Sequence, residues 1–265
     1  MDEKALETLF FWVSFFTFGS VIGSFLNVVI YRWPREESVV LPRSKCPHCG
    51  APIPGYLNIP VFAWLFLRGR AACCGAKISA RYPLVEFLTG ALFVLTYHIF
   101  GLSFQTFEYC LFVVMFVPCV FIDLEHYLLP DVLTIPGIFV GLVGSFVSDS
   151  RTFLSSLMGV VIGGGSLWFV AWFYERYRHK EGMGFGDIKL IAWLGALGGF
   201  SCLPFVIFVS SALGTLVGLG LMVFKGADKN TAIPFGPFLI FAAFLYFYFS
   251  LSLKSLFPSL FIFLI

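Results

Sequence analysis

The sequence has 265 residues, of which 59% are hydrophobic and only 12% are charged, and its formal net charge is +2. A soluble domain of this length carries about twice that fraction of charged residues, so the composition excludes an ordinary soluble protein and predicts a polytopic membrane protein. A net charge so close to zero gives no indication of nucleic-acid binding, and we expect none.

Apolar stretches long enough to cross a bilayer recur along the whole chain. Because a transmembrane helix needs about 20 largely apolar residues, we predict an all-α polytopic membrane protein with about eight transmembrane helices. The sixth and seventh helices are the least clearly separated, and residues 256–265 are too few to cross alone. The predicted helices cover residues 9–31, 84–101, 104–122, 132–146, 153–174, 184–199, 203–224 and 233–253.

The polar connections divide the chain into three parts and orient it. Residues 1–31 form the first helix, residues 32–83 a loop module, and residues 84–265 the second to eighth helices. With eight helices, 14 of the 17 lysines and arginines fall on one side of the membrane. Positively charged loops stay in the cytoplasm, so we predict that the loop module is cytoplasmic.

The loop module contains a candidate metal site. Two of its cysteines form Cys46-Pro47-His48-Cys49, and Cys73 and Cys74 follow 24 residues later. Two Cys-x-x-Cys pairs at such a separation would indicate a zinc ribbon, but the second pair is incomplete here. Adjacent cysteines bind one metal only with strain, which favours Cys46, Cys49 and Cys74 over Cys73. Zinc bound to these four residues would hold the small module together and would take no part in hydrolysis. We expect the other cysteines to pack as apolar side chains.

Two acidic residues stand where apolar helices meet polar connections on the same predicted side. Asp123 follows the third helix, and Asp187 begins the sixth within Gly184-Phe185-Gly186-Asp187. A carboxylate at the edge of the membrane is costly to ionise, so it often marks a functional site. Two carboxyl groups held close together share one proton and can hydrolyse an amide by general acid–base catalysis. The structural alternative is that Asp187 caps its helix and Asp123 is an interfacial loop residue.

Other polar residues beside the two acids have simpler interpretations. Asp131 opens the fourth helix, so we interpret it as a helix N-cap. Glu125 and His126 share the Asp123 loop and could tune the pKa of Asp123, but we expect them to be solvated loop residues. Lys189 lies two positions beyond Asp187, on a different helix face, and its side chain is expected to extend to the membrane interface.

Several motifs together resemble those of the type IV prepilin peptidases, which are also called leader peptidase/N-methyltransferases. The Asp123 and Asp187 stretches resemble the two catalytic aspartates of that family, the second in the Gly-x-Gly-Asp form shared with presenilin-like proteases. The resemblance covers nearly the whole chain. Its other motifs are Gly23-Ser24-Phe25-Leu26-Asn27-Val28, Arg32-Trp33-Pro34, the cysteine stretch that begins at Pro42, and Ile78–Glu86.

The resemblance implies a bifunctional enzyme of the bacterial inner membrane with its active site on the cytoplasmic side. It would cut the basic leader from prepilins or pseudopilins with Asp123 and Asp187 and then methylate the new amino terminus with S-adenosylmethionine. Asn27, Arg81 and Glu86 are the candidates for binding that methyl donor. The family's second Cys-x-x-Cys is altered here, because Ala71 stands at its first position and Cys73 is additional.

Two other classes of protein fit the composition. An ion-coupled transporter also has acids in membrane helices, but it places them near the middle of the bilayer. A non-catalytic assembly scaffold would use the cysteine module to bind a cytoplasmic partner and would tolerate replacement of Asp123 or Asp187 by asparagine.

Overall fold

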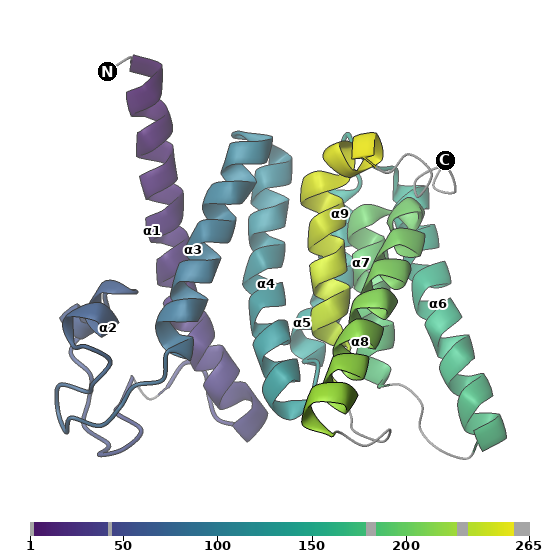
Figure 1. Ribbon diagram of the computed structural model, residues 1–265. Helices are drawn as coiled ribbons and strands as arrows, with labels where there is room; N and C mark the ends of the chain where they lie inside the picture. Colours follow the sequence, from purple (N-terminus) through teal and green to yellow (C-terminus); the bar gives the residue numbers. More distant parts are fainter. Residues whose placement is uncertain (1–2, 42–43, 179–183, 227–232, 257–265) are drawn as a thin grey trace. The chain divides into compact units, whose positions relative to one another are not determined.

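The computed structural model describes residues 3–41, 44–178, 184–226 and 233–256, and it is helical almost throughout (Figure 1). The chain forms two compact units, Met1–Pro118 and Cys119–Ile265. The boundary falls inside one helix, at its internal proline, Pro118. Arg43, Lys180 and Lys229, on which part of the predicted orientation depends, lie outside the described residues, as does the segment after Leu256.

Each of the eight apolar stretches that we expected to cross the membrane forms a helix. Within the described residues, five helices are long and apolar enough to cross a membrane, namely α1, α3, α4, α6 and α8, whereas α5 and the described part of α9 are shorter apolar helices. The number of spans therefore stays a prediction, while the all-helical membrane fold is confirmed. The bounds are α1 Glu3–Arg32, α3 Arg81–Phe100, α4 Phe104–His126, α5 Asp131–Gly144, α6 Phe153–Arg178, α7 Phe185–Gly198, α8 Leu203–Lys225 and α9 Gly236–Leu256.

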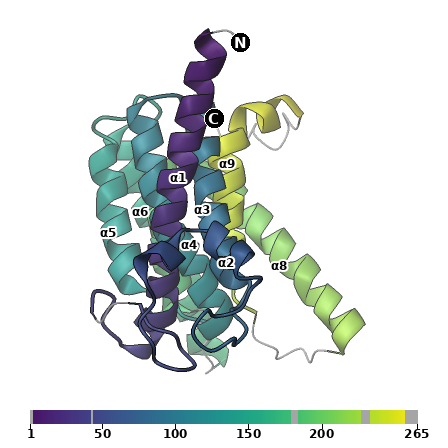
Figure 2. The same cartoon turned by 90° about the vertical axis from the view of Figure 1, so that its left-hand side faces the viewer.

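In the first unit, α1 and α3 pack side by side through small residues (Figures 1 and 2). Gly19 lies against Gly90, and a Cβ at Gly19 would be 2.9 Å from the Gly90 Cα atom. One turn further on, a Cβ at Gly23 would be 2.8 Å from the Cα atom of Glu86. Such close backbone contact is typical of membrane helices, which gain van der Waals contact by using small residues at their interfaces.

Between α1 and α3 the chain forms the loop module, which contains the short helix α2 (Phe62–Phe66). Two antiparallel bridges, Lys45 with Pro52 and Arg70 with Lys77, close two tight turns. Apolar residues of the module form α2, and Phe62 and Phe66 are exposed. The module thus has almost no core of its own, and small modules of this kind usually need a metal ion or a disulfide for stability.

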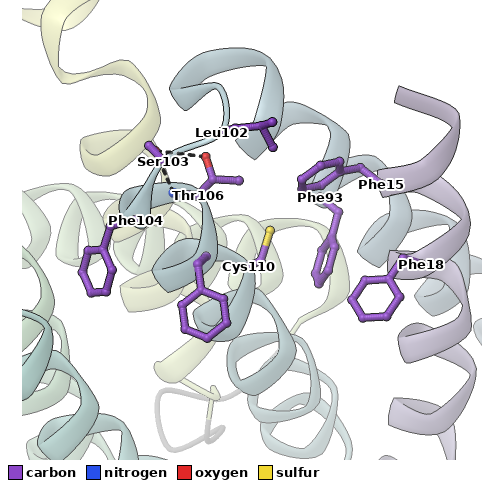
Figure 3. Close-up of a pocket in the computed structure, with 9 residues that line it drawn as sticks. Phe15, Phe18, Phe93, Leu102, Ser103, Phe104, Thr106 and Cys110 are labelled. Carbon is purple, nitrogen blue, oxygen red and sulfur yellow. Dashed lines mark hydrogen bonds between the residues drawn. The ribbon is translucent and has the colours of Figure 1, made fainter. Parts of the chain in front are cut away.

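A second feature of the first unit is an apolar cavity of about 540 Å³ among α1, α3 and α4 (Figure 3). Its polar residues are already bonded within the protein, because the Thr106 hydroxyl donates to the Gly101 carbonyl oxygen and the Ser103 hydroxyl lies 3.3 Å from that of Thr106. No lining residue carries a charge, so the cavity offers no group for acid–base chemistry. It is lined by Phe15, Phe18, Phe93, Leu102, Ser103, Phe104, Thr106, Phe107 and Cys110.

In the second unit, α7 is the central helix. Its residues from Leu190 to Leu197 are all buried, and a helix that is apolar on every side is stable only when other helices surround it. The neighbouring helices contact it through glycines. Gly137 of α5 lies against the Trp193 ring, and Gly159 of α6 lies against the backbone of Gly195. At 14 residues, or about 21 Å, α7 is shorter than the hydrocarbon core of a bilayer.

Candidate active site

The two candidate acids lie at helix ends in the second unit. Asp123 belongs to the last turn of α4, which continues to His126, so our prediction that the helix ends at Ile122 was wrong by about one turn. Its side chain is only 5% exposed. Asp187 is in the first turn of α7 and is half-buried. Helical hydrogen bonds continue through Asp123, whose carbonyl oxygen accepts from the Tyr127 N–H group, and this extension takes the acid out of the connecting loop.

The structure brings the two acids together around one apolar side chain, Leu129. A Cβ at Gly186 would lie 2.8 Å from the Leu129 Cβ, and a Cβ at Gly236 would lie 3.3 Å from the Leu129 methyl groups. Gly236 in turn contacts Asp123, and Gly186 directly precedes Asp187. The Asp187 carboxyl group lies within electrostatic range of Asp123.

Gly186 leaves room for a neighbouring side chain. Leu129 fills the space beside it, where a substrate backbone would otherwise approach. Gly184 is extended, with φ −67° and ψ 138°, and its carbonyl oxygen accepts from the Asp187 N–H group at 3.1 Å. The motif thus sets the start of α7 and lets that end of the helix pack closely against Leu129.

Gly236 was missed by the sequence reasoning. Its backbone N–H group donates to Oδ2 of Asp123 at 3.0 Å, and a Cβ at this position would lie 2.7 Å from the same oxygen atom. The residue follows 113 positions after Asp123, so local spacing gives no sign of the contact. The available signal was Pro234-Phe235-Gly236-Pro237, a rigid stretch that begins an apolar helix.

The neighbouring polar residues correct three expectations. Asp131 does not cap α5, because Pro130 is the N-cap and no side-chain cap is formed. Its carboxylate instead accepts from the Lys189 ammonium group at 2.5 Å, so Lys189 is paired rather than extended to the interface. Glu125 and His126 belong to α4 and not to a loop; Glu125 is exposed, as expected, whereas His126 is half-buried. The ion pair joins the start of α5 to α7, close to Asp187.

In the first unit, Asn27, Arg81 and Glu86 lie where α1 and α3 meet beside the loop module. The Asn27 amide donates to the Tyr82 carbonyl oxygen at 3.0 Å, next to Arg81. Glu86 Oε2 accepts from the Val61 N–H group at 2.7 Å. Val61 has φ +64°, which is unusual for a β-branched residue, so Glu86 holds a strained turn of the loop module. The Asn27 Oδ1 atom is buried and has no hydrogen-bond partner.

The structure gathers all four loop cysteines, whose Sγ atoms lie within 4.8 Å of one another. The Cys46 and Cys74 sulfur atoms are 3.7 Å apart, and those of Cys49 and Cys73 are 3.3 Å apart. Four sulfur atoms bound to one tetrahedral zinc ion at 2.3 Å would be about 3.8 Å apart. The donor set and its spacing therefore fit zinc.

The two turns that carry these cysteines have the same backbone pattern. In the first, Gly50 N–H donates to the Cys46 carbonyl oxygen, and in the second, Gly75 N–H donates to that of Ala71. Both glycines have φ near +70°, at +73° and +70°. Ala71 thus occupies the place of Cys46, and Cys73 supplies the sulfur atom that Ala71 lacks.

Backbone hydrogen bonds favour a thiolate at Cys46. The N–H groups of Cys49 and His48 lower the pKa of the Cys46 thiol to about 6. Because the thiolate is the form that binds metal, the first turn is suited to a metal ion near neutral pH.

The second unit thus holds two acidic side chains at the ends of apolar helices. Comparisons with known proteins show the class of enzyme. Residues 17–100 match the model of the Bacterial Peptidase A24 N-terminal domain, and residues 110–219 match that of the Type IV leader peptidase family.

Similar proteins extend this match over most of the chain. A prepilin leader peptidase/N-methyltransferase of Aeromonas hydrophila is 40% identical over 87% of this chain and 89% of its own length. The protein of the same name from Pseudomonas aeruginosa is 36% identical, and the match covers 91% of each chain. No solved structure matches the chain significantly. The chain belongs to the type IV leader peptidase family and is a multi-pass inner-membrane enzyme, a protease that is also an N-methyltransferase.

Proposed function

We propose that this protein cleaves the leader peptide of type IV prepilins or pseudopilins with Asp123 and Asp187. The observation that carries the proposal is the meeting of these two acids at the ends of α4 and α7, around Leu129 and Gly236. The relatives named as prepilin leader peptidases indicate the class of substrate. Neither a transporter nor a scaffold accounts for membership of a peptidase family.

The chemistry is hydrolysis without a covalent intermediate. One carboxylate takes a proton from a water molecule, and the water oxygen forms a bond to the carbonyl carbon of the scissile peptide. The other carboxyl group gives its proton to the carbonyl oxygen, so a neutral gem-diol forms. When the C–N bond breaks, the protonated carboxyl group gives its proton to the leaving amine and the other carboxylate takes a proton from a gem-diol hydroxyl group, so the pair again holds one proton.

The active site is assigned to the cytoplasmic side of the membrane. Asp187 begins the helix that follows α6, whose last turn carries Arg176 and Arg178. Positively charged residues beside a transmembrane helix favour the cytoplasm. A basic leader peptide in the cytoplasm would then reach the acids while the apolar part of its substrate stays in the bilayer.

We assign S-adenosylmethionine as the methyl donor, with Asn27, Arg81 and Glu86 as its binding residues. The fit depends mainly on Asn27, whose buried Oδ1 atom has no partner and can accept from an amino group. One oxygen of the Glu86 carboxylate already accepts from the Val61 N–H group, so Glu86 would bind the donor while it also keeps the loop module in place. The bound donor would supply an electrophilic methyl group to the free amine that cleavage creates.

Incubation of the purified full-length protein with a prepilin in detergent tests this function. We expect cleavage of the leader without added S-adenosylmethionine and, when it is present, a product heavier by one methyl group, as measured by mass spectrometry. An uncut prepilin would refute the peptidase assignment. A cut but unmethylated product would refute the assignment of the methyl donor.

We also propose that zinc binds Cys46, Cys49, Cys73 and Cys74 and stabilises the loop module, and we expect Cys73→Ser to lower the zinc content as strongly as Cys49→Ser. Each change removes one of four thiolate ligands from the cluster. The measurement is zinc per protein by mass spectrometry of the metal, together with protease resistance of the loop.

The control for the zinc experiment is Cys110→Ser, which changes a buried cysteine of α4 outside the cluster. It should leave the zinc content unchanged. Full zinc in the Cys73→Ser protein would show that three cysteines bind the metal and that Cys73 is additional.

A further inference from the structure

The two acids do not have equivalent surroundings. Asp123 accepts a hydrogen bond from the Gly236 N–H group at 3.0 Å. Within the described residues, the Asp187 carboxyl group receives no such bond. Gly236 is the first residue of α9, and the first N–H groups of a helix have no partner inside the helix. The donor is therefore free to bind a side chain without cost to α9.

A backbone N–H group stabilises a carboxylate more than a carboxylic acid. The N-terminus of α9 also favours negative charge at Asp123, whereas the C-terminus of α4 opposes it, so these two dipole effects offset each other. Asp187 lies in the first turn of α7 and gains the dipole of that helix alone. A direct hydrogen bond to a charged oxygen is stronger than such a dipole effect.

We propose that Gly236 is the positioning residue of the acid pair, and that its N–H group holds Asp123 as the carboxylate, so that the shared proton resides on Asp187. This inference rests on the proposed peptidase function and assigns a role to each acid. Asp123 is the base that takes the proton of the attacking water, and Asp187 is the acid that protonates the carbonyl oxygen of the scissile bond.

The geometry around Gly236 supports a positioning role. With a Cβ at 2.7 Å from Asp123 Oδ2 and 3.3 Å from Leu129, any larger residue would displace the carboxylate or the start of α9. Gly236 therefore fixes Asp123 by its N–H group and by its lack of a side chain. Leu129 contacts both Gly236 and Gly186 and so connects the start of α9 with the start of α7, which carries Asp187.

Several titratable groups on the helices around Asp123 can contribute to the pH dependence of leader cleavage. They are Asp187 on α7, Cys119, Glu125 and His126 on α4, and the ion pair of Asp131 with Lys189. Asp123 and Asp187 share one proton, so both limbs of a bell-shaped profile belong to the pair. The acidic limb reports loss of the first proton, and the basic limb reports loss of the second.

The decisive experiment replaces only the Gly236 N–H group, by incorporating glycolic acid at position 236 to give an ester bond. If Asp123 loses its proton first, the acidic limb of kcat/KM for leader cleavage moves to higher pH by about one unit and the basic limb stays. If Asp187 loses its proton first, the basic limb moves instead. That outcome, or no movement of either limb, would overturn the proposal.

The control is the matching ester at Phe238, made with 3-phenyllactic acid so that the side chain is kept; the Phe238 N–H group donates to the Phe235 carbonyl oxygen and does not contact Asp123. It perturbs the same turn of α9 and should move neither limb. Asn variants of Asp123 and Asp187 test the peptidase function separately, because they remove the pair, whereas the ester tests which acid holds the proton.

A conventional variant gives a second test. Gly236→Ala should lower kcat by about tenfold or more, because the added methyl group displaces the Asp123 carboxylate, while KM changes less than twofold. Its thermal unfolding in detergent shows whether it is folded. Gly220→Ala on α8, where a Cβ would meet nothing within 4 Å, should keep the wild-type values. A Gly236→Ala protein with wild-type kcat and pH limbs would contradict the proposal.

Discussion

Replacement of Asp123 or Asp187 by asparagine is expected to abolish leader cleavage, with a loss of at least about 1,000-fold in kcat/KM. An amide neither takes a proton from water nor holds the proton that the pair shares. The measurement is the rate of prepilin cleavage by the purified variants, compared at equal amounts of folded protein.

The control for the aspartate variants is Asp149→Asn, which changes an exposed acid in the connection between α5 and α6. It should cleave at the wild-type rate. Both catalytic variants should still methylate a peptide that already has a free amino terminus, since Asn27, Arg81 and Glu86 belong to the other unit. Substantial cleavage by either asparagine variant would refute the mechanism of two acids.

Replacement of Gly159 by leucine is expected to destabilise the second unit and to inactivate the peptidase. Gly159 of α6 and Gly195 of α7 pack backbone against backbone, and a Cβ at Gly159 would lie 2.3 Å from the Gly195 carbonyl oxygen. Because neither backbone can move aside locally, the helices must separate, at a cost of about 1–3 kcal/mol. The separation would displace α7 and, with it, Asp187.

The test compares the variants by thermal unfolding in detergent and by leader cleavage. Gly165→Leu is a matched control, because it lies on the same helix where a Cβ would meet nothing within 4 Å. It should unfold and cleave like the wild-type protein. Wild-type stability and activity in the Gly159→Leu protein would show that the contact between α6 and α7 does not position the acid.

The membrane fold follows from the sequence because apolar length is a local property. Each apolar stretch forms a helix, and the ends of α8 agree with the prediction to within one residue. The errors lie at polar ends such as α4, where Asp123 continues the helix. Hydropathy marks the edge of the apolar region, whereas the helix ends where its backbone hydrogen bonds end, and the two need not coincide.

The cysteine module shows what sequence spacing leaves open. Because Cys73 is adjacent to Cys74, the sequence predicted that Cys73 is the least suitable of the four ligands. Its Sγ atom nevertheless lies 3.3 Å from that of Cys49. The equivalent backbone turns at Gly50 and Gly75 explain this position, because they place the cysteines of both halves of the module around one point. Sequence alone identifies the four thiols but does not establish how two turns face each other.

The sequence by itself determined that this is a helical membrane protein and indicated Asp123 and Asp187 as its candidate catalytic acids, because apolar length and costly intramembrane charge are local signals. Only the tertiary structure decided what surrounds them. The Gly236 N–H group at Asp123, Leu129 against Gly186, and the pairing of Asp131 with Lys189 all join residues from distant parts of the chain. These contacts depend on how the helices pack in three dimensions, which no local pattern of residues encodes.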